Sequence, residues 1–179
     1  MKYTSAPPGE IHALKCELAS EVLRSSGKLR LSVTGWSMLP TIWPGDTLMI
    51  DRAEIGAVSE GDIVLCARDQ RFAAHRLLTN NASMIVTRGD AMSQPDPPVS
   101  NCDLLGKVAF IMRNGKCIAP RKSLRLYERI VAKMIQRSHI AARVIVRVHQ
   151  MLQRSQIENS TVRPTRYQSE RYQSEPCQS

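Results

Sequence analysis

The spacing of hydrophobic residues changes once within the first quarter of the chain. Four apolar residues first recur at helical spacing: Ile11, Leu14, Leu18 and Val22. Pro8 and Gly9 open this run and Gly27 ends it, which predicts a helix. From Lys28 the period becomes two, since three apolar residues alternate with polar ones: Leu29, Leu31 and Val33. This alternation predicts a half-buried strand that runs into the next loop.

The centre of the chain contains short apolar stretches bounded by turn residues. They cover residues 47–50, 63–67, 72–78, 84–87 and 104–112. Gly-Asp pairs lie beside them at 45–46, 61–62 and 89–90, and Asn114-Gly115 predicts a tight hairpin turn of the primed type. Together these patterns predict a mainly β (α+β) fold: a small antiparallel β domain with an N-terminal helix and a C-terminal amphipathic helix or helices.

After Pro120 the helical period returns. Apolar residues fall along one side of this segment: Tyr127, Ile130, Val131, Met134, Ala141, Ile145, Val148 and Leu152. Arginines and lysines lie mostly off that side. Two interpretations stay open: a helix packed on the sheet with a solvated basic face, or a basic amphipathic helix that lies on anionic lipid.

These patterns divide the chain into four parts. We expect an N-terminal helix in 1–27, a β domain in 28–119, a basic amphipathic helical segment in 120–153 and a tail in 154–179. The tail is polar and contains a five-residue duplication at 166–170 and 171–175, so we expect it to be disordered.

The net charge of +9 belongs almost entirely to one segment. Residues 121–154 contain nine Lys or Arg and a single acid, Glu128. Such a segment favours an anionic partner, such as a phospholipid surface, nucleic acid or an acidic polypeptide, and an anionic membrane surface is one candidate partner of this helix. Nucleic acid is not expected, because no recognition turn accompanies the helix.

The cysteines indicate a reducing compartment. The five of them are scattered and form no Cys-x-x-Cys, which argues against a disulfide framework and against a zinc site. The first ten residues lack the apolar core of a signal peptide, and no apolar run reaches the ~18 residues of a spanning helix. We therefore expect a cytoplasmic protein, peripheral at most at the inner face of a membrane, with neither metal nor cofactor.

Three separated motifs supply the residues for nucleophilic catalysis. Residues 35–41 read Gly-Trp-Ser-Met-Leu-Pro-Thr and place Ser37 between a glycine and a proline. His75 follows in Ala-Ala-His-Arg, and two acids, Asp90 and Asp96, follow Gly89. Each residue alone has an ordinary structural interpretation as a turn or surface residue. In combination they offer a hydroxyl, a base that accepts its proton and a carboxylate that orients the base.

In this order the motifs are similar to those of the signal peptidase I and LexA-like clan of serine peptidases. The similarity runs from Leu31 to Val108 and includes the Gly-Asp strands at 44–50 and 60–65. That clan's bacterial members use a lysine base before arginine, whereas residues 29–106 contain no lysine and His75 stands at that place. A His-Arg pair resembles the archaeal and endoplasmic-reticulum signal peptidases, although the membrane anchor that precedes the serine in that branch is missing here.

The resemblance implies a role for each residue. Ser37 would be the nucleophile, His75 the general base, Asp96 the first choice for the orienting acid and Asp90 the second. The backbone N–H of Ser37 would bind the oxyanion beside Gly35, with Met38 next to it. Some relatives place a hydroxyl where Gly35 stands, so the second oxyanion donor stays open.

The sequence thus predicts a serine endopeptidase that cleaves a leader or precursor peptide. Two alternatives remain: a LexA-like self-cleaving regulator, and a non-catalytic peptide-binding member of the fold. Only about 30 residues precede the serine block, too few for a DNA-binding helix-turn-helix domain with a linker.

Overall fold

The computed structural model describes residues 8–68, 71–81, 83–137 and 147. All of these except Arg147 belong to one compact unit, Met1–Arg143. This unit contains an N-terminal helix, α1 (Pro8–Ser26), a single eight-stranded sheet, and a second helix, α2 (Leu126–Arg137). Two 3-10 turns, η1 (Ile55–Ala57) and η2 (Asn101–Asp103), connect strands of the sheet.

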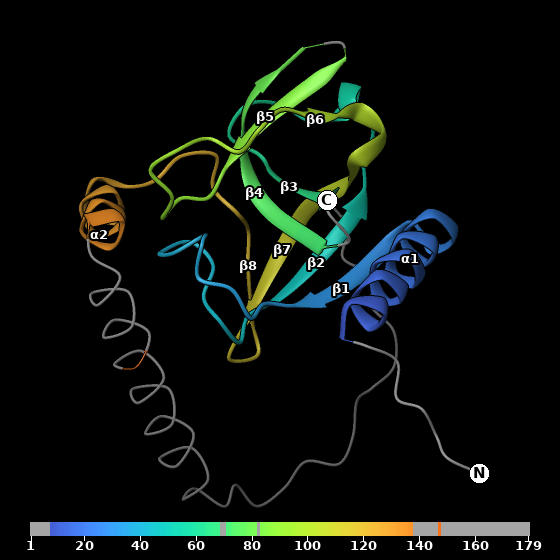
Figure 1. Ribbon diagram of the computed structural model, residues 1–179. Helices are drawn as coiled ribbons and strands as arrows, with labels where there is room; N and C mark the ends of the chain where they lie inside the picture. Colours follow the sequence, from blue (N-terminus) through green and yellow to red (C-terminus); the bar gives the residue numbers. More distant parts are fainter. Residues whose placement is uncertain (1–7, 69–70, 82, 138–146, 148–179) are drawn as a thin grey trace, which may run out of the picture. The chain divides into compact units, whose positions relative to one another are not determined.

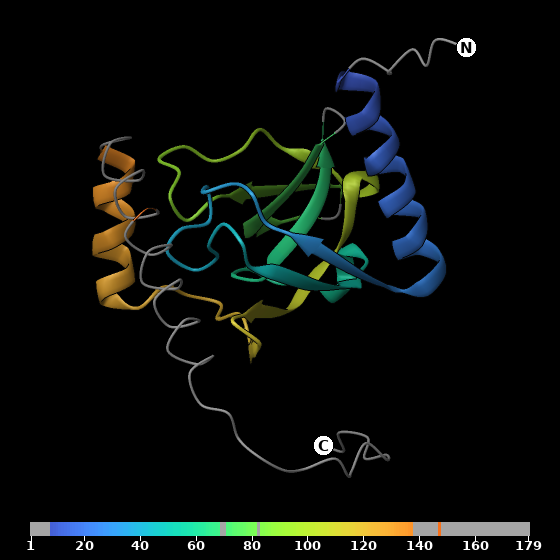
Figure 2. The same ribbon diagram turned by 90° about the horizontal axis from the view of Figure 1, so that it is seen from below.

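The sheet is antiparallel throughout and curls into a half-barrel (Figures 1 and 2). Its strands run in the order β1-β2-β7-β3-β4-β5-β6, and β8 pairs with β7. Their bounds are β1 (Lys28–Ser32), β2 (Thr47–Arg52), β3 (Ile63–Arg68), β4 (Arg71–Asn80), β5 (Met84–Arg88), β6 (Val99–Ser100), β7 (Leu104–Arg113) and β8 (Lys116–Ile118). The predicted fold class, a small antiparallel β domain with a helix near each end, is confirmed.

Two local predictions from the sequence are confirmed in detail. Along β1, Leu29 and Leu31 are half-buried, while the three residues that alternate with them are exposed. Asn114 and Gly115 both have positive φ, 51° and 74°, as a primed turn requires, and they join β7 to β8. Strand β6 was not predicted, because two residues are too short to show a period.

The three Gly-Asp pairs have a common structure. Asp46, Asp62 and Asp90 are all buried, between 2% and 7% exposed. Each carboxylate pairs with a basic side chain that the sheet brings to it: Arg113, Lys107 and Arg76, respectively. A buried carboxylate is costly unless it is paired, so these ion pairs fix the loops in which the aspartates lie.

Helix α1 uses a different side for packing than its apolar spacing suggests. Leu23, 1% exposed, joins the core formed by β1, β2, β3 and β7, and Ser20 is buried beside it. Leu14, Leu18 and Val22 are 56%, 57% and 48% exposed. The spacing predicts the helix correctly, but a periodic apolar run does not show which of its flanks reaches the sheet.

Helix α2 is the described part of the segment expected over 120–153. It buries Ala132 and Ile135, whereas Tyr127, Ile130 and Met134 are each more than half exposed. Val131, on the same predicted apolar side, is half-buried, so this side is only partly packed in the described helix. Residues 138–153 other than 147, and the tail expected in 154–179, lie outside the described residues. None of the helices described here is long and apolar enough to cross a membrane.

Candidate active site

The loop that carries Ser37 connects β1 to β2 and is held by buried residues directly after the serine. Met38 and Leu39, directly after Ser37, are 4% and 0% exposed. Backbone bonds from Leu39 N to Trp36 O and from Thr41 N to Met38 O, 3.2 and 2.9 Å, close the turn around it, and the Leu39-Pro40 peptide is cis. The buried side chains hold the turn while Ser37 itself stays half-exposed at the surface.

A second anchor closes the base of the same loop. The Arg113 guanidinium on β7 donates to both carboxylate oxygens of Asp46, at 2.9 and 2.6 Å, and to the carbonyl oxygen of Thr41 at 2.9 Å. Asp46 also accepts from the backbone N–H of Trp43 at 2.7 Å. The loop is therefore tied to the sheet at two points on the C-terminal side of the serine.

His75 lies between the serine and an aspartate. Its Nε2 atom is 2.9 Å from Ser37 Oγ, and its Nδ1 atom is 2.6 Å from Asp96 Oδ2. An ionised carboxylate only accepts hydrogen bonds, so the ring proton belongs on Nδ1. This tautomer leaves Nε2 free to accept the proton of the serine hydroxyl, which is the arrangement a general base needs.

Asp96 is positioned by a threonine of β5. Thr87 is 3% exposed, and its hydroxyl donates to Asp96 Oδ2 at 2.7 Å. The backbone N–H of Asp96 in turn donates to Thr87 O at 2.8 Å. The two bonds bring the loop after β5 back alongside the strand, which aims the carboxylate at His75.

The charge of Asp96 is stabilised by its surroundings. Burial raises the pKa of this carboxyl, but hydrogen bonds from His75 and Thr87, together with the charges of His75 and Arg68, outweigh burial and hold the pKa below its ordinary value. Asp96 therefore stays an anion at neutral pH, as an acid that stabilises an imidazolium must.

Asp90, the second acid expected for the histidine, contacts other groups. Its two oxygens accept from Arg76 Nε and Nη2, both at 2.8 Å, and its Oδ2 also accepts from the Thr41 hydroxyl. Arg76 Nη1 donates further to the carbonyl oxygens of Gly61 and Arg121, at 2.8 and 2.7 Å. Asp90 thus ties β4 to the serine loop through Arg76 and Thr41.

Gly89 allows the loop that carries Asp90 and Asp96 to approach Ser37 closely. A Cβ at this position would lie 2.5 Å from the carbonyl oxygen of Ser37, so the close approach requires glycine. The backbone N–H of Ala91 donates to the same oxygen at 2.8 Å. The Ser37 backbone is thereby fixed from the side of the loop that carries both aspartates.

The two residues expected near the oxyanion differ in accessibility. Gly35 has open space where a side chain would begin, since no atom of the described chain other than Gly35 and its two chain neighbours lies within 4 Å of that point. The Met38 side chain is buried in the core with Leu48 and Ile50, so only its backbone can face a substrate.

Three residues that support the site, Thr87, Thr41 and Arg76, could not be predicted from the sequence. Arg76 stands beside His75 in the motif, but nothing in a single sequence showed that its partner is Asp90. Thr87 occupies an ordinary strand position, and only the fold brings its hydroxyl to Asp96.

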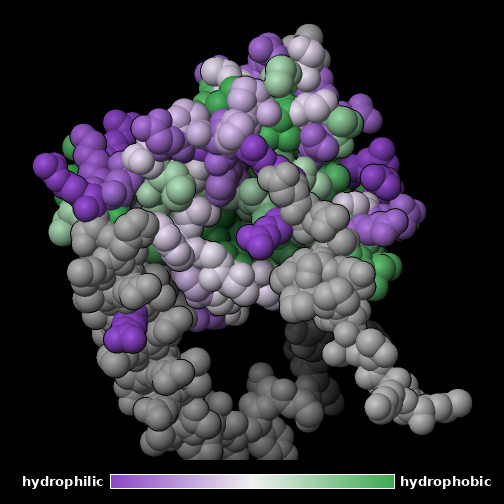
Figure 3. Space-filling view, in the orientation of Figure 1, coloured by the Kyte–Doolittle hydropathy of each residue, from purple (hydrophilic) through white to green (hydrophobic). Residues whose placement is uncertain are grey.

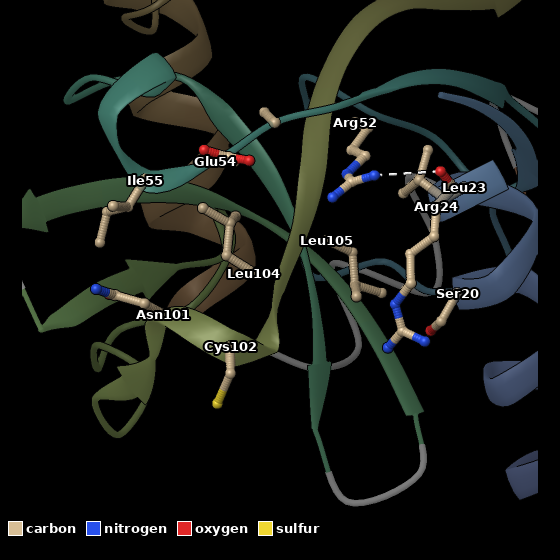
Figure 4. Close-up of a pocket in the computed structure, with 11 residues that line it drawn as sticks. Ser20, Leu23, Arg24, Arg52, Glu54, Ile55, Asn101, Cys102, Leu104 and Leu105 are labelled. Carbon is tan, nitrogen blue, oxygen red and sulfur yellow. Dashed lines mark hydrogen bonds between the residues drawn. The ribbon is translucent and has the colours of Figure 1, made fainter. Parts of the chain in front are cut away.

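Other features of the described chain do not contribute to this centre. A cavity of about 410 Å³ between α1 and the β2–η1 and η2 segments contains Arg24 and Arg52, and Arg52 Nη1 donates to the Arg24 carbonyl oxygen (Figure 4). Ser37, His75 and Asp96 do not line it. Within the described residues, no group of three or more His, Cys, Asp or Glu side chains is placed to hold a metal ion.

Comparison with known proteins identifies the family. The model of the Peptidase S24-like family matches residues 8–109, more than half of the 179-residue chain, and the match includes Ser37, His75 and Asp96. No curated protein matches the sequence. The chain therefore belongs to the Peptidase S24-like family, serine peptidases of the LexA and signal peptidase type.

Proposed function

We propose that the protein is a serine endopeptidase that cleaves a leader or precursor peptide with Ser37, His75 and Asp96. The observation that supports it most is the pair of contacts at His75, 2.9 Å to the serine hydroxyl and 2.6 Å to the carboxylate. With these contacts the protein resembles the signal peptidases that have a histidine base rather than the members with a lysine base.

The proposed reaction has two halves. Ser37 Oγ attacks the peptide carbonyl carbon while its proton moves to His75 Nε2, and Asp96 stabilises the imidazolium. The oxyanion of the tetrahedral intermediate accepts a hydrogen bond from the Ser37 N–H. When the C–N bond breaks, His75 gives its proton to the leaving amine. A water molecule, deprotonated by His75, then attacks the acyl-serine ester; the bond from the carbonyl carbon to Ser37 Oγ breaks, His75 returns the proton to Ser37 Oγ, and the second product is released.

Two free strand edges support an extended peptide as the substrate. Among the described strands, β1 pairs only with β2, and residues 71–75 of β4 pair only with β3, because pairing with β5 begins at Arg76. β1 leads to Ser37, and the free half of β4 ends at His75. A peptide that adds to such an edge gains main-chain hydrogen bonds and is delivered to the catalytic residues.

Half-buried apolar residues on and beside the two edge strands would receive the substrate's side chains. They pack against the core without being covered: Leu29, Leu31, Val33, Phe72 and Ala74. Figure 3 shows a hollow with an apolar floor near the middle of this face. Partly exposed apolar surface of this kind favours small or apolar side chains beside the cut.

We further propose that α2 attaches the protein peripherally to an anionic membrane. Ile130 and Met134 are 58% and 57% exposed. The basic residues Arg129 and Lys133 directly precede them in α2, so exposed apolar and basic side chains lie next to one another. The scattered cysteines of the sequence, none of which lies in a Cys-x-x-Cys motif, support a reducing compartment, and thus the cytoplasmic face.

A peptide-library assay tests the peptidase proposal. The purified chain is incubated with a mixture of synthetic peptides, and the products are identified by mass spectrometry. We expect defined cleavage by the wild type and by Ser83→Ala, a control for an exposed serine in the turn between β4 and β5, and none by Ser37→Ala. Cleavage that persists in Ser37→Ala would refute the proposed nucleophile.

The same samples separate the alternatives. Fragments of the chain itself, formed on incubation without peptide and absent in Ser37→Ala, would favour the self-cleaving regulator. Binding of peptides without any cleavage by the folded wild type would favour the non-catalytic member of the fold.

A further inference from the structure

A cationic cavity lies between α2 and the loop that follows β5. Its volume is about 500 Å³, within the range of sites that hold small molecules. Its lining includes five basic residues from β4, β5, the segment before α2 and α2 itself: Arg76, Arg88, Lys122, Arg129 and Lys133. Among the described residues that line it, Asp90 is the only acid.

Asp90 neutralises only a small part of the positive charge that lines the cavity. Asp90 is bound by Arg76 through two hydrogen bonds, so that pair is neutral. Lys122 contacts Ser59 Oγ at 2.8 Å and lies 3.8 Å from Asp62. Among the residues that the structure describes, no carboxylate forms an ion pair with Arg88, Arg129 or Lys133. Like charges held together repel, and a bound anion relieves that repulsion.

The neutral lining fits an oxyanion. The hydroxyl-bearing residues Ser93 and Ser123 line the cavity beside the cations. A phosphate group presents several oxygens that accept charge-assisted hydrogen bonds, and guanidinium groups match it with paired donors. We propose that this cavity binds a phosphate group, a ligand that the peptidase reaction does not use.

The position of the cavity favours a phospholipid headgroup over a free phosphate compound. Arg129 and Lys133 are one turn apart on α2, and Ile130 and Met134 lie on the neighbouring exposed side. Figure 3 shows strongly hydrophilic side chains gathered over this helix. If the apolar side enters a membrane, the cavity meets the layer of headgroups. In this form the inference extends the proposed membrane attachment, but the cavity itself can be tested without lipid.

Phosphate binding is tested first with inorganic phosphate on the full chain. The melting temperature is followed during a phosphate titration at constant ionic strength, which gives a dissociation constant. The test variant is Arg129→Gln with Lys133→Gln. The control is Arg125→Gln with Arg137→Gln, which removes the same charge from the same helical segment at residues that do not line the cavity. We expect binding to be at least about tenfold weaker in the test pair and unchanged in the control.

Vesicles then identify the source of the phosphate. Sedimentation with phosphatidylglycerol vesicles and with phosphatidylcholine vesicles is compared for the same proteins. Binding to phosphatidylglycerol that is lost only in the test pair supports a lipid headgroup; binding of inorganic phosphate alone, with the same dependence, supports a free phosphate compound. Arg129→Lys with Lys133→Arg should retain binding in either case, and circular dichroism checks that every variant is folded.

Two results would overturn the inference. One is equal weakening in the test and control pairs, which would mean general attraction to a basic helix. The other is the absence of binding to both ligands by the folded wild type. Neither result bears on peptide cleavage, which is measured without phosphate or lipid. The peptidase proposal and the proposal of phosphate binding are therefore tested independently.

Discussion

Two consecutive residues of β4, His75 and Arg76, build two different networks on opposite faces of the strand. His75 and Asp96 are 13% and 24% exposed in their side chains and open toward Ser37. The side chains of Arg76 and Asp90 are 10% and 4% exposed. Arg76 donates to backbone carbonyl oxygens, and Asp90 accepts from the Thr41 hydroxyl. Since successive side chains of a strand point to opposite faces, a single dipeptide supplies both.

The difference shows what each basic residue is suited to. An imidazole can accept and return a proton near neutral pH, and it lies where a hydroxyl must be deprotonated. A guanidinium keeps its charge, and it lies where a buried carboxylate must be held. We therefore expect substitutions at the first network to change catalysis, and substitutions at the second to change stability.

The largest expected contrast is in turnover. Asp96→Asn should lower kcat by about 10⁴-fold, because a neutral amide favours the wrong imidazole tautomer and cannot stabilise the imidazolium. Asp90→Asn should have a much smaller effect on kcat. Both are measured as kcat on the best peptide from the library, with the folded fraction checked by circular dichroism. The reverse order would show that Asp90 orients the histidine.

For the free energy of unfolding, we expect the larger loss at Asp90 and the smaller loss at Asp96. Asp90→Ala leaves the Arg76 charge buried without its carboxylate, which should lower the free energy of unfolding by about 3–5 kcal/mol. Asp96→Ala should cost less, since its site is more exposed. Urea denaturation of the two variants gives the comparison. An equal loss in both would mean that the second network is not the more structural one.

Thr87→Val tests the support of Asp96 by a smaller change. Valine has nearly the shape of threonine but lacks the hydroxyl that donates to Asp96 Oδ2. We expect kcat to fall about tenfold with little change in KM, as loss of one charge-assisted hydrogen bond predicts. Thr79→Val, an exposed threonine on β4, is the matched control. Equal effects at the two positions would rule out a positioning role for Thr87.

The smallest effect concerns acid stability. Burial raises the pKa of Asp62, but hydrogen bonds from Lys107 and Ser59 and the charges of Lys107 and Lys122 bring it below its ordinary value, and Asp96 is also lowered. For both groups the folded-state pKa lies below the unfolded one. Their contribution to stability is therefore complete above the unfolded value, about pH 4, and is lost as pH falls through the folded value.

Urea denaturation at neutral pH and in this acid range measures that loss. Asp62→Asn should show a shallower fall of stability with pH than the wild type, because one of the two groups no longer titrates. An unchanged pH dependence in Asp62→Asn would contradict the assigned ion pair with Lys107.

Features of this molecule that depend on short-range sequence patterns could be predicted, whereas its long-range contacts could not. The alternation in β1 and the Asn114-Gly115 turn depend on local backbone preferences, and they could be predicted from the sequence. The packing side of α1 depends on where the sheet lies, and the apolar spacing of Leu14 and Leu18 did not reveal it.

The candidate site divides in the same way. Ser37, His75 and Asp96 stand out as motifs because each bears a reactive or titratable group. Thr87 and the Arg76–Asp90 pair depend on contacts between segments many residues apart, and a single sequence contains no signal for such pairings.

The central claim is that Ser37 and His75 act as one catalytic unit, and a double-mutant cycle tests it most directly. The measurement is kcat on the best library peptide for Ser37→Ala, His75→Ala and the double variant. Each single change should lower kcat by on the order of 10⁶-fold, and the double variant should be no slower than either. Losses that multiply in the double variant, or turnover that survives His75→Ala, would contradict the account.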